Sequence, residues 1–373
     1  MKQFLIYISY FCCSVCFGQT IETIAGTGTN AHGGDGGLAT QASFATPFDV
    51  AVDDAGNVYV SESGAARVRR IDAITGIIST IFGGGSDSGD GILGPNYLLD
   101  NPGYIQVHNN ALYVSDYSLH KILKMSLVDS IVTTIAGNGS TLFSPDGSNA
   151  SVSSIGRPYG LDFDADGTLY FVENENNRVR YIDPNGNLQT LCGIGSGGTA
   201  NTDGPFGTGT LSDPWGLTIY NGHAYNTDFS NSTVREINLQ DGYITTLNLP
   251  GGSFNGDGMN IANTTLSYAI EVEFDVEGNV LVADNEADGI RKVDHDSQIV
   301  STIVGTGNPG YSGDGGHPLD AEIHDPIGMV LDQYGNLIFV GNDNFVVRKV
   351  VFCKDPDHPI INVYNNQTTI ECG

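Results

Sequence analysis

A unit of 55 to 57 residues recurs six times, and this repetition constrains the fold more than any other feature of the chain. The residues that open the units are Pro47, Pro102, Pro158, Pro214, Ala269 and Pro326. A fixed period of this kind is typical of architectures in which each unit buries its apolar face against its neighbours. The repeats therefore predict one domain, although length alone would suggest two or three.

Each unit predicts four short strands. In the first unit the runs PFDVAVD, NVYVSE, RVRRID and IISTIF are rich in Val, Ile, Tyr or Phe, and turns containing Gly, Asn, Asp or Ala separate them. This pattern is typical of consecutive hairpins. One four-stranded sheet buries only one face, so it needs neighbours. Six such sheets packed radially form a six-bladed β-propeller, which leaves only short edges.

The fourth strand of the sixth unit is missing from its expected place. Units one to five end in an apolar strand such as IISTIFG or IVSTIVG, but the chain changes character after Phe352. The matching sequence, IETIAG at 21–26, stands near the other end. We therefore predict an all-β six-bladed propeller whose last blade is closed by the N-terminal strand.

The two ends of the chain differ from the repeats. Lys2 precedes an apolar run over 4–17, and small residues suit cleavage before Gln19, so we predict a secretory signal peptide over 1–18. The propeller is predicted over 19–353. The tail 354–373 predicts a hairpin with Asn365-Asn366 at its turn. It either packs on the propeller or begins a truncated module. We expect a secreted, extracellular or periplasmic protein.

The charge of the chain limits its partners. There are 15 Lys and Arg against 43 Asp and Glu, a formal net charge of −28. Such a surface repels phosphate backbones and anionic lipids, so we expect neither nucleic acid nor membrane insertion. Three cysteines remain after the predicted cleavage, so one disulfide at most forms and one thiol at least stays free. Cys192 replaces Ala or Val of the repeat, which predicts a buried small apolar residue.

The run GNVYVSESGAARVRRID, with TIAGTG and GDGG in the linkers, resembles the NHL-repeat propellers, particularly exported bacterial ones. The resemblance covers residues 20–352. Two copies depart from the pattern: Asn110-Ala111 shortens one hairpin, and Gly341 replaces an acid. The resemblance implies a scaffold that presents a surface for protein, glycan or RNA. It implies no single chemistry.

Charged residues recur at fixed positions of the unit. A base stands in the third strand of five units and Leu123 in the remaining one; the bases are Arg69, Arg180, Arg235, Arg291 and Arg348. An acid stands in each long linker: Asp35, Asp90, Asp146, Asp203, Asp257 and Asp314. A second set ends the second strand: Glu62, Asp116, Glu173, Asp228 and Asp284. We predict Arg–carboxylate pairs that tie linker or turn to strand. The alternative is an anion-binding ring.

One motif has the spacing of a calcium loop. Asp162, Asp164 and Asp166 are followed by Gly167 and, later, by Glu173. The flanking sequences predict strands and exclude the helices of an EF-hand. A calcium loop within the hairpin is one interpretation. An ordinary Asp-Gly turn, as in the other units, is the other.

The first residues of the inner strands predict the binding site. In a closed ring these residues surround the mouth of the central channel, which is the default pocket. They include Phe48, Asp49, Tyr104, Tyr159, Trp215 and Glu271. Tyr and Trp combine apolar area with a polar group, which suits a sugar or a peptide side chain. The alternative is that these rings pack between blades.

No catalytic or metal-binding residue is predicted, because the histidines share no position of the unit and no short ligand spacing. The predicted function is a monomeric scaffold that binds protein or carbohydrate, without catalysis. The alternative, which follows from the NHL-like lyases and the related lactonase propellers, is an enzyme with a metal in the central channel.

Overall fold

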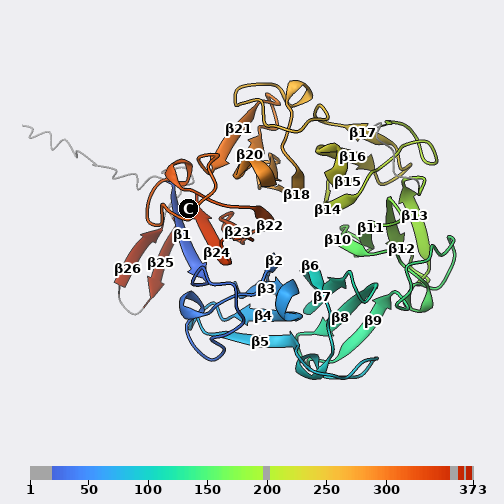
Figure 1. The fold of residues 1–373 in the computed structure, drawn as a ribbon, viewed down its shortest axis with the longest axis horizontal. Helices are drawn as coiled ribbons and strands as arrows, with labels where there is room; N and C mark the ends of the chain where they lie inside the picture. The colour runs from blue at the N-terminus through green and yellow to red at the C-terminus, as the bar shows by residue number, and fades with distance from the viewer. Residues whose placement is uncertain (1–18, 196–201, 353–359, 365–366, 372–373) are drawn as a thin grey trace, which may run out of the picture.

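Six four-stranded antiparallel sheets stand as blades around a central axis (Figure 1). The structure is a computed structural model and describes residues 19–195, 202–352, 360–364 and 367–371. The predicted all-β six-bladed propeller is confirmed. The predicted signal peptide, 1–18, lies outside the described residues. No helix among the described residues has the length and apolar character needed to span a bilayer.

Blades 1 to 6 follow one another in chain order. The inner strands are β2 (Pro47–Val52), β6 (Pro102–His108), β10 (Pro158–Phe163), β14 (Pro214–Tyr220), β18 (Ala269–Phe274) and β22 (Pro326–Leu331). The second strands are β3 (Val58–Glu62), β7 (Ala111–Asp116), β11 (Leu169–Glu173), β15 (His223–Asp228), β19 (Val280–Asp284) and β23 (Leu337–Gly341). The third strands are β4 (Arg67–Ile71), β8 (Lys121–Ser126), β12 (Arg178–Ile182), β16 (Thr233–Asn238), β20 (Gly289–Val293) and β24 (Val346–Val351). The outer strands are β5 (Ile78–Gly83), β9 (Val132–Ala136), β13 (Leu188–Cys192), β17 (Ile244–Thr246), β21 (Val300–Val304) and β1 (Thr20–Ala25).

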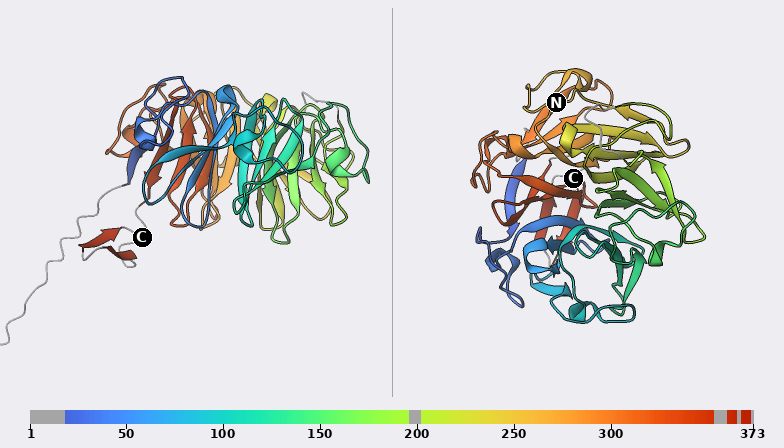
Figure 2. Two further views of the ribbon diagram at one scale, coloured as in Figure 1. Left: turned by 90° about the horizontal axis from the view of Figure 1, so that it is seen from below. Right: turned by 45° about the vertical axis from the view of Figure 1, so that its right-hand side comes forward.

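Short 3-10 turns occur in the linkers and after some second strands. They are η1 (Ala39–Gln41), η2 (Ser63–Ala65), η3 (Gly94–Asn96), η4 (Ala150–Val152), η5 (Phe229–Asn231), η6 (Ile261–Asn263), η7 (Asn285–Ala287) and η8 (Pro318–Asp320). Figure 2 shows the ring edge-on, with loops joining the strands at both of its faces.

The ring closes through the N-terminal strand, as predicted. β1 pairs antiparallel with β24, and Ile21 lies opposite Val350. The blue β1 lies beside the red β24 in Figure 1, so the two parts of the chain complete one sheet. In the tail, β25 (Ile360–Tyr364) and β26 (Gln367–Glu371) form the predicted hairpin as a separate two-stranded sheet. The turn residues Asn365 and Asn366, and Cys353 and Cys372, lie outside the described residues.

A buried apolar cluster joins the inner strands to residues further out in the blades. Each inner strand contributes a residue to it: Phe48, Tyr104, Tyr159, Leu217, Ile270 and Ile327. Cys192 belongs to the same cluster and is fully buried with a free thiol. Burial raises the pKa of this thiol to about 12, so it behaves as the small apolar residue that the repeat predicts.

The recurring arginines are buried and paired with carboxylates, which confirms the ion-pair prediction. Nη2 of Arg69 lies 2.7 Å from Oδ1 of Asp35, in the linker, and Nη1 lies 3.5 Å from Glu62. Arg180 and Arg235 likewise contact both a linker acid and a strand acid. Arg348 contacts its linker acid and Arg291 its strand acid. In blades 1, 3, 4 and 6 these pairs fasten the linker to its blade.

Candidate functional site

The structure brings the predicted aromatic residues together at the axis. The ring of Phe48 lies 5.4 Å from that of Tyr104 and 6.0 Å from that of Trp215, measured between centroids. Tyr159 stacks on Trp215 at 4.8 Å. A β-bulge at the start of every inner strand places these residues against the axis. Phe48, Tyr104 and Tyr159 are buried, and Trp215 is half-buried. The rings therefore pack on one another and fill the channel mouth.

The two predicted acids lie beneath these rings, away from solvent. Asp49 and Glu271 are each 5% exposed. Their neighbours in the ring are glycines: a Cβ on Gly328 would lie 2.2 Å from Asp49 Oδ1, and one on Gly216 would lie 2.8 Å from Glu271 Oε1. Only glycine leaves room for these carboxyl groups, because the inner strands converge. The predicted site is therefore divided into an aromatic layer and an acidic layer.

Two further acids share the acidic layer, and sequence analysis did not assign them to it. A cavity of about 40 Å³ is lined by Asp49, Asp162, Glu271 and Glu273, among others. Glu273 stands two residues beyond Glu271, and Asp162 stands two residues beyond Gly160, which occupies the position of Asp49 in its unit. Because side chains at i and i+2 share one face of a strand, this alternation is the signal that could have found them. The cavity has room for about one or two water molecules.

Burial dominates the electrostatics of this cavity. It raises the pKa of Asp49 to about 7 and that of Glu273 to about 8. Burial and the nearby Asp49 raise the pKa of Glu271, and burial raises that of Asp162. None of the described residues that line the cavity is basic, so no cation offsets the cost of ionisation.

We expect stability to fall as pH rises because of these acids. Since their folded pKa values lie above the ordinary carboxyl values, the folded state binds protons that the unfolded state has released between about pH 4 and pH 8. The free energy of unfolding therefore decreases with rising pH over that window. Glu273→Gln should raise the free energy of unfolding at pH 8.5 by about 4–5 kcal/mol and leave it unchanged at pH 4. Urea denaturation at both pH values measures this.

The control is Glu22→Gln, because Glu22 is exposed on β1. It should leave the pH dependence as it is in the wild type. Equal pH dependence of the Glu273→Gln variant and the wild type would contradict the assignment of Glu273 as a protonated buried acid.

Five aromatic side chains around the mouth form what we call the aromatic stack: Tyr117, Tyr159, Trp215, Phe229 and Tyr268. Tyr159 stacks on Tyr117 at 5.3 Å between centroids. Trp215 stacks on Tyr159 and on Phe229, each at 4.8 Å. Tyr268 contacts Phe229 at 5.0 Å. Apart from the buried Tyr159, all are partly exposed. The stack presents ring edges along the mouth, since neighbouring rings cover the faces of Trp215.

Two members of the stack replace a residue that links blades elsewhere. The residue after the second strand is asparagine in blades 3, 5 and 6, but Tyr117 and Phe229 in blades 2 and 4. Each asparagine amide donates to the carbonyl of the residue that opens the next blade: Asn174 to Pro214 at 3.1 Å, Asn285 to Pro326 at 3.4 Å, and Asn342 to Pro47 at 2.8 Å. Blades 2 and 4 thus have a partly exposed ring where blades 3, 5 and 6 have a hydrogen bond to the next blade.

A guanidinium lies against the stack. Arg157 Nη2 donates to the Tyr159 hydroxyl at 3.1 Å, and its guanidinium carbon lies 5.5 Å from the ring centroid of Tyr117. Its Nε lies 4.0 Å from Glu175, and both side chains are about two-fifths exposed. The surface therefore combines aromatic edges, hydroxyl groups and an accessible cation. Sequence analysis missed Tyr117, Phe229, Tyr268 and Arg157, because only the closed ring shows which loop residues meet.

The residues of the calcium motif point to different places. Asp162 accepts hydrogen bonds from Gln106 and the Ile219 backbone in the channel. Asp164 accepts the backbone N–H of Asp166 and Thr168 in the hairpin turn. Glu173 contacts Arg180, 3.3 Å away. Within the described ranges, no group of three or more His, Cys, Asp or Glu side chains is arranged to hold a metal ion.

Known proteins share this sequence pattern over most of the chain. No protein-family model matches. NHL repeat-containing protein 2 of Bos taurus is 25% identical over 366 residues, which cover 88% of this chain and 49% of that protein. Protein SUPPRESSOR OF QUENCHING 1, chloroplastic, of Arabidopsis thaliana is 23% identical over 334 residues, which cover 88% of this chain and 27% of that protein. The chain has NHL-repeat homologues. It spans less than half the length of each of these relatives.

Solved structures share the fold at low sequence identity. An auxiliary nutrient binding protein from Bacteroides thetaiotaomicron has a TM-score of 0.66 and 14% identity, with 89% of this chain and 76% of that chain covered. A streptogramin B lyase has a TM-score of 0.54 and 14% identity, with 89% of this chain and 97% of that chain covered. These proteins bind nutrients or act as lyases on one architecture, so the likeness shows the fold alone.

Proposed function

We propose that this propeller is an exported protein-binding module whose aromatic stack docks a segment of a partner protein. The observation that carries the proposal is the partly exposed stack with Arg157 beside it. Tyr, Trp, Phe and Arg are the residues enriched in the centres of protein interfaces. Tyr117 and Phe229 also replace the asparagine that links blades elsewhere, so the scaffold alone does not require them.

The geometry favours a protein over a carbohydrate. A sugar ring binds an aromatic side chain through the ring face, whereas the faces of Trp215 stack on Tyr159 and Phe229. The stack offers edges and hydroxyl groups instead, which suit apolar and polar side chains of a polypeptide. Both ligand classes are compatible with the name of the nutrient-binding structural neighbour, so the experiment below includes both.

An enzyme acting at the channel acids is the other function considered. The acids Asp49, Asp162, Glu271 and Glu273 line a cavity of only about 40 Å³, and Phe48 and Tyr104 are buried at the mouth. A lactone or a larger substrate does not fit this space. The geometry therefore favours binding at the mouth over catalysis beneath it.

Tyr117→Asn and Phe229→Asn test the proposal with little risk to the fold, because asparagine already occupies this position in three blades. Peptides selected from a random display library on the wild-type protein should bind each variant about tenfold or more weakly, as expected for central interface aromatics. Calorimetry or fluorescence anisotropy measures the dissociation constants. Melting temperatures should stay within a few degrees of the wild type.

Tyr334→Asn is the matched control, because Tyr334 is an exposed aromatic in the hairpin turn between β22 and β23. It should leave peptide binding unchanged. A glycan array run on the same proteins decides between ligand classes: glycan binding that both stack variants lose would replace the protein partner by a carbohydrate. Peptide binding that survives both substitutions would remove the aromatic stack as the site.

A further inference from the structure

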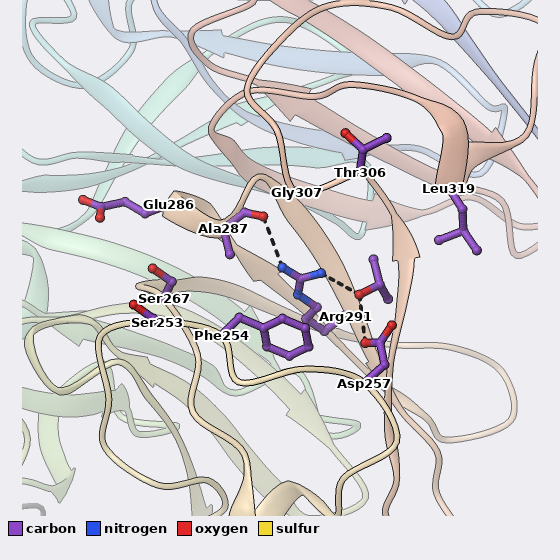
Figure 3. Close-up of a pocket in the computed structure, with 12 residues that line it drawn as sticks. Ser253, Phe254, Asp257, Ser267, Glu286, Ala287, Arg291, Thr306, Gly307 and Leu319 are labelled. Carbon is purple, nitrogen blue, oxygen red and sulfur yellow. Dashed lines mark hydrogen bonds between the residues drawn. The ribbon is translucent and has the colours of Figure 1, made fainter.

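Blade 5 departs from the arginine arrangement of the other blades. In blades 1, 3, 4 and 6 the arginine contacts the linker aspartate at 2.5 to 3.3 Å. In blade 5, Arg291 donates to Asp284 at 3.1 Å. It also donates to the Thr302 hydroxyl at 2.6 Å and to the Ala287 carbonyl at 3.2 Å (Figure 3). The linker acid Asp257 accepts from the Thr302 hydroxyl at 2.9 Å and lacks the guanidinium that its counterparts in blades 1, 3, 4 and 6 hold.

A glycine explains this departure. The residue two positions before the arginine is Arg67, Arg178, Thr233 or Val346 in the other four blades, but Gly289 in blade 5. A Cβ on Gly289 would lie 2.7 to 2.8 Å from the guanidinium atoms of Arg291. The guanidinium of Arg291 therefore occupies space that a side chain fills elsewhere. It lies 3.9 Å from the ring centroid of Phe254, closer than in the equivalent contacts of Phe143 and Tyr311, at 5.2 and 5.5 Å.

The displaced arginine leaves a pocket beside Asp257. Its volume is about 580 Å³, and its lining includes Arg291 itself together with Phe254, Asp257, Glu286 and Leu319 (Figure 3). Asp257 and Glu286 are exposed, while the charge of Arg291 is offset by its buried partner Asp284. The pocket therefore carries net negative charge and disfavours an anion. Its size lies within the range of small-molecule and side-chain pockets.

We propose that this pocket binds a guanidinium group from outside the chain. In other blades, the residues equivalent to Asp257 and Phe254 contact an arginine of the chain itself. In blade 1, Oδ1 of Asp35 accepts from both Nε and Nη2 of Arg69, at 3.0 and 2.7 Å. In blades 3 and 6 an aromatic ring stands three residues before the aspartate, as Phe254 does before Asp257, and lies over the guanidinium. The linker aspartate is thus this fold's own guanidinium acceptor. In blade 5 the guanidinium of Arg291 already covers the Phe254 ring, so Asp257 is the group that holds the incoming guanidinium.

The charge of the whole chain supports a cationic ligand. Because the formal net charge of the chain is −28, its surface attracts cations over a distance set by the salt concentration. The guanidinium has two sources: a free alkylguanidine, or an arginine side chain of a partner. Ser267 lines the pocket and is followed in the chain by Tyr268 of the aromatic stack. A partner on the stack could therefore place an arginine here, but the pocket does not depend on the stack.

Titration with agmatine by calorimetry at low salt tests the proposal. The wild type should bind one agmatine per chain, and Asp257→Asn should weaken binding about tenfold or more. Gly289→Val should do the same, because a side chain at 289 moves the Arg291 guanidinium onto Asp257 and fills the pocket. Valine already stands at this position in blade 6, and Gly289 does not require a positive φ. This variant should therefore melt no lower than the wild type.

Asp87→Asn is the matched control, since Asp87 is an exposed acid in the blade 2 linker and its loss changes the net charge equally. It should leave agmatine binding unchanged. Putrescine, a diamine without a guanidinium, should bind more weakly than agmatine. If capped Gly-Arg-Gly binds as tightly as agmatine, the source of the guanidinium is a partner's arginine. If it binds more weakly, the source is a free alkylguanidine. The proposal would be overturned if the wild type and the Asp257→Asn and Gly289→Val variants bound agmatine equally. It would also be overturned if the wild type bound putrescine as tightly as agmatine.

Discussion

Deleting residues 19–28 should remove cooperative unfolding of the propeller or lower its melting temperature more than any single substitution does. These residues include β1, which completes blade 6 by pairing with β24. Without β1, the N–H and C=O groups of β24 form an open sheet edge. Ile21, fully buried against Phe339 and Val350, is lost as well. The linker of blade 6 also loses its bonds, because the Ile21 backbone pairs with Gly315 and Gly316.

Two point substitutions on β1 give graded versions of this experiment. Ile21→Ala should lower the free energy of unfolding by about 2–5 kcal/mol, the usual range for a large buried aliphatic side chain. Glu22→Ala, one residue further along the same strand and exposed, should change it by less than about 0.5 kcal/mol. Calorimetry and urea denaturation measure both. A deletion protein that melts like the full chain would show that β1 does not close the ring.

The repeat predicted the scaffold because its signals are local and sixfold. Alternating Val, Ile and Tyr define strands within a few residues, and the absence of a fourth strand after Phe352 required a partner from elsewhere. The arginine pairs followed from the same regularity, since Arg69 and Asp35 keep a constant spacing in most units.

The site was less predictable, because it consists of departures from the repeat. Phe48 and Tyr104 lie against each other at the axis, but one strand does not reveal how closely the inner strands converge, and both side chains are buried. Tyr117 and Phe229 meet Trp215 only through the ring geometry. In blade 5 the decisive residue is Gly289. Its effect could not be predicted, because it depends on the conformation that the flexible Arg291 side chain adopts in the space beside it.

Replacing Arg69 by Leu should lower the free energy of unfolding by about 3–5 kcal/mol, because it leaves a buried carboxylate without its cation. Both Arg69 and Glu62 are fully buried. Burial already raises the pKa of Glu62, and the Arg69 charge opposes this effect. Urea denaturation at pH 7 measures the loss.

Leu123 in blade 2 shows that the need for the arginine depends on which other groups donate hydrogen bonds to the strand acid. Leu123 is fully buried where the other blades have arginine. The acid of that blade, Asp116, accepts four backbone N–H groups instead: those of Asp100, Asn101, Ser118 and Leu119, at 2.8 to 3.2 Å. Glu62 accepts one backbone N–H, from Ala45. Blade 1 therefore depends on its arginine, whereas blade 2 does not.

The double variant Arg69→Leu, Glu62→Gln should recover part of the loss, since the amide has no charge to bury. Arg70→Leu is the control on the same strand: Arg70 pairs with Asp72 near the surface, where both side chains are about one-third exposed, so its loss should cost less than about 1 kcal/mol. If Arg69→Leu costs no more than Arg70→Leu, the buried pairs do not hold the linkers to the blades. If the double variant is no more stable than Arg69→Leu, the cost lies in the lost bonds to Asp35 and the linker carbonyls of Gly33 and Ser43, and not in the buried charge of Glu62.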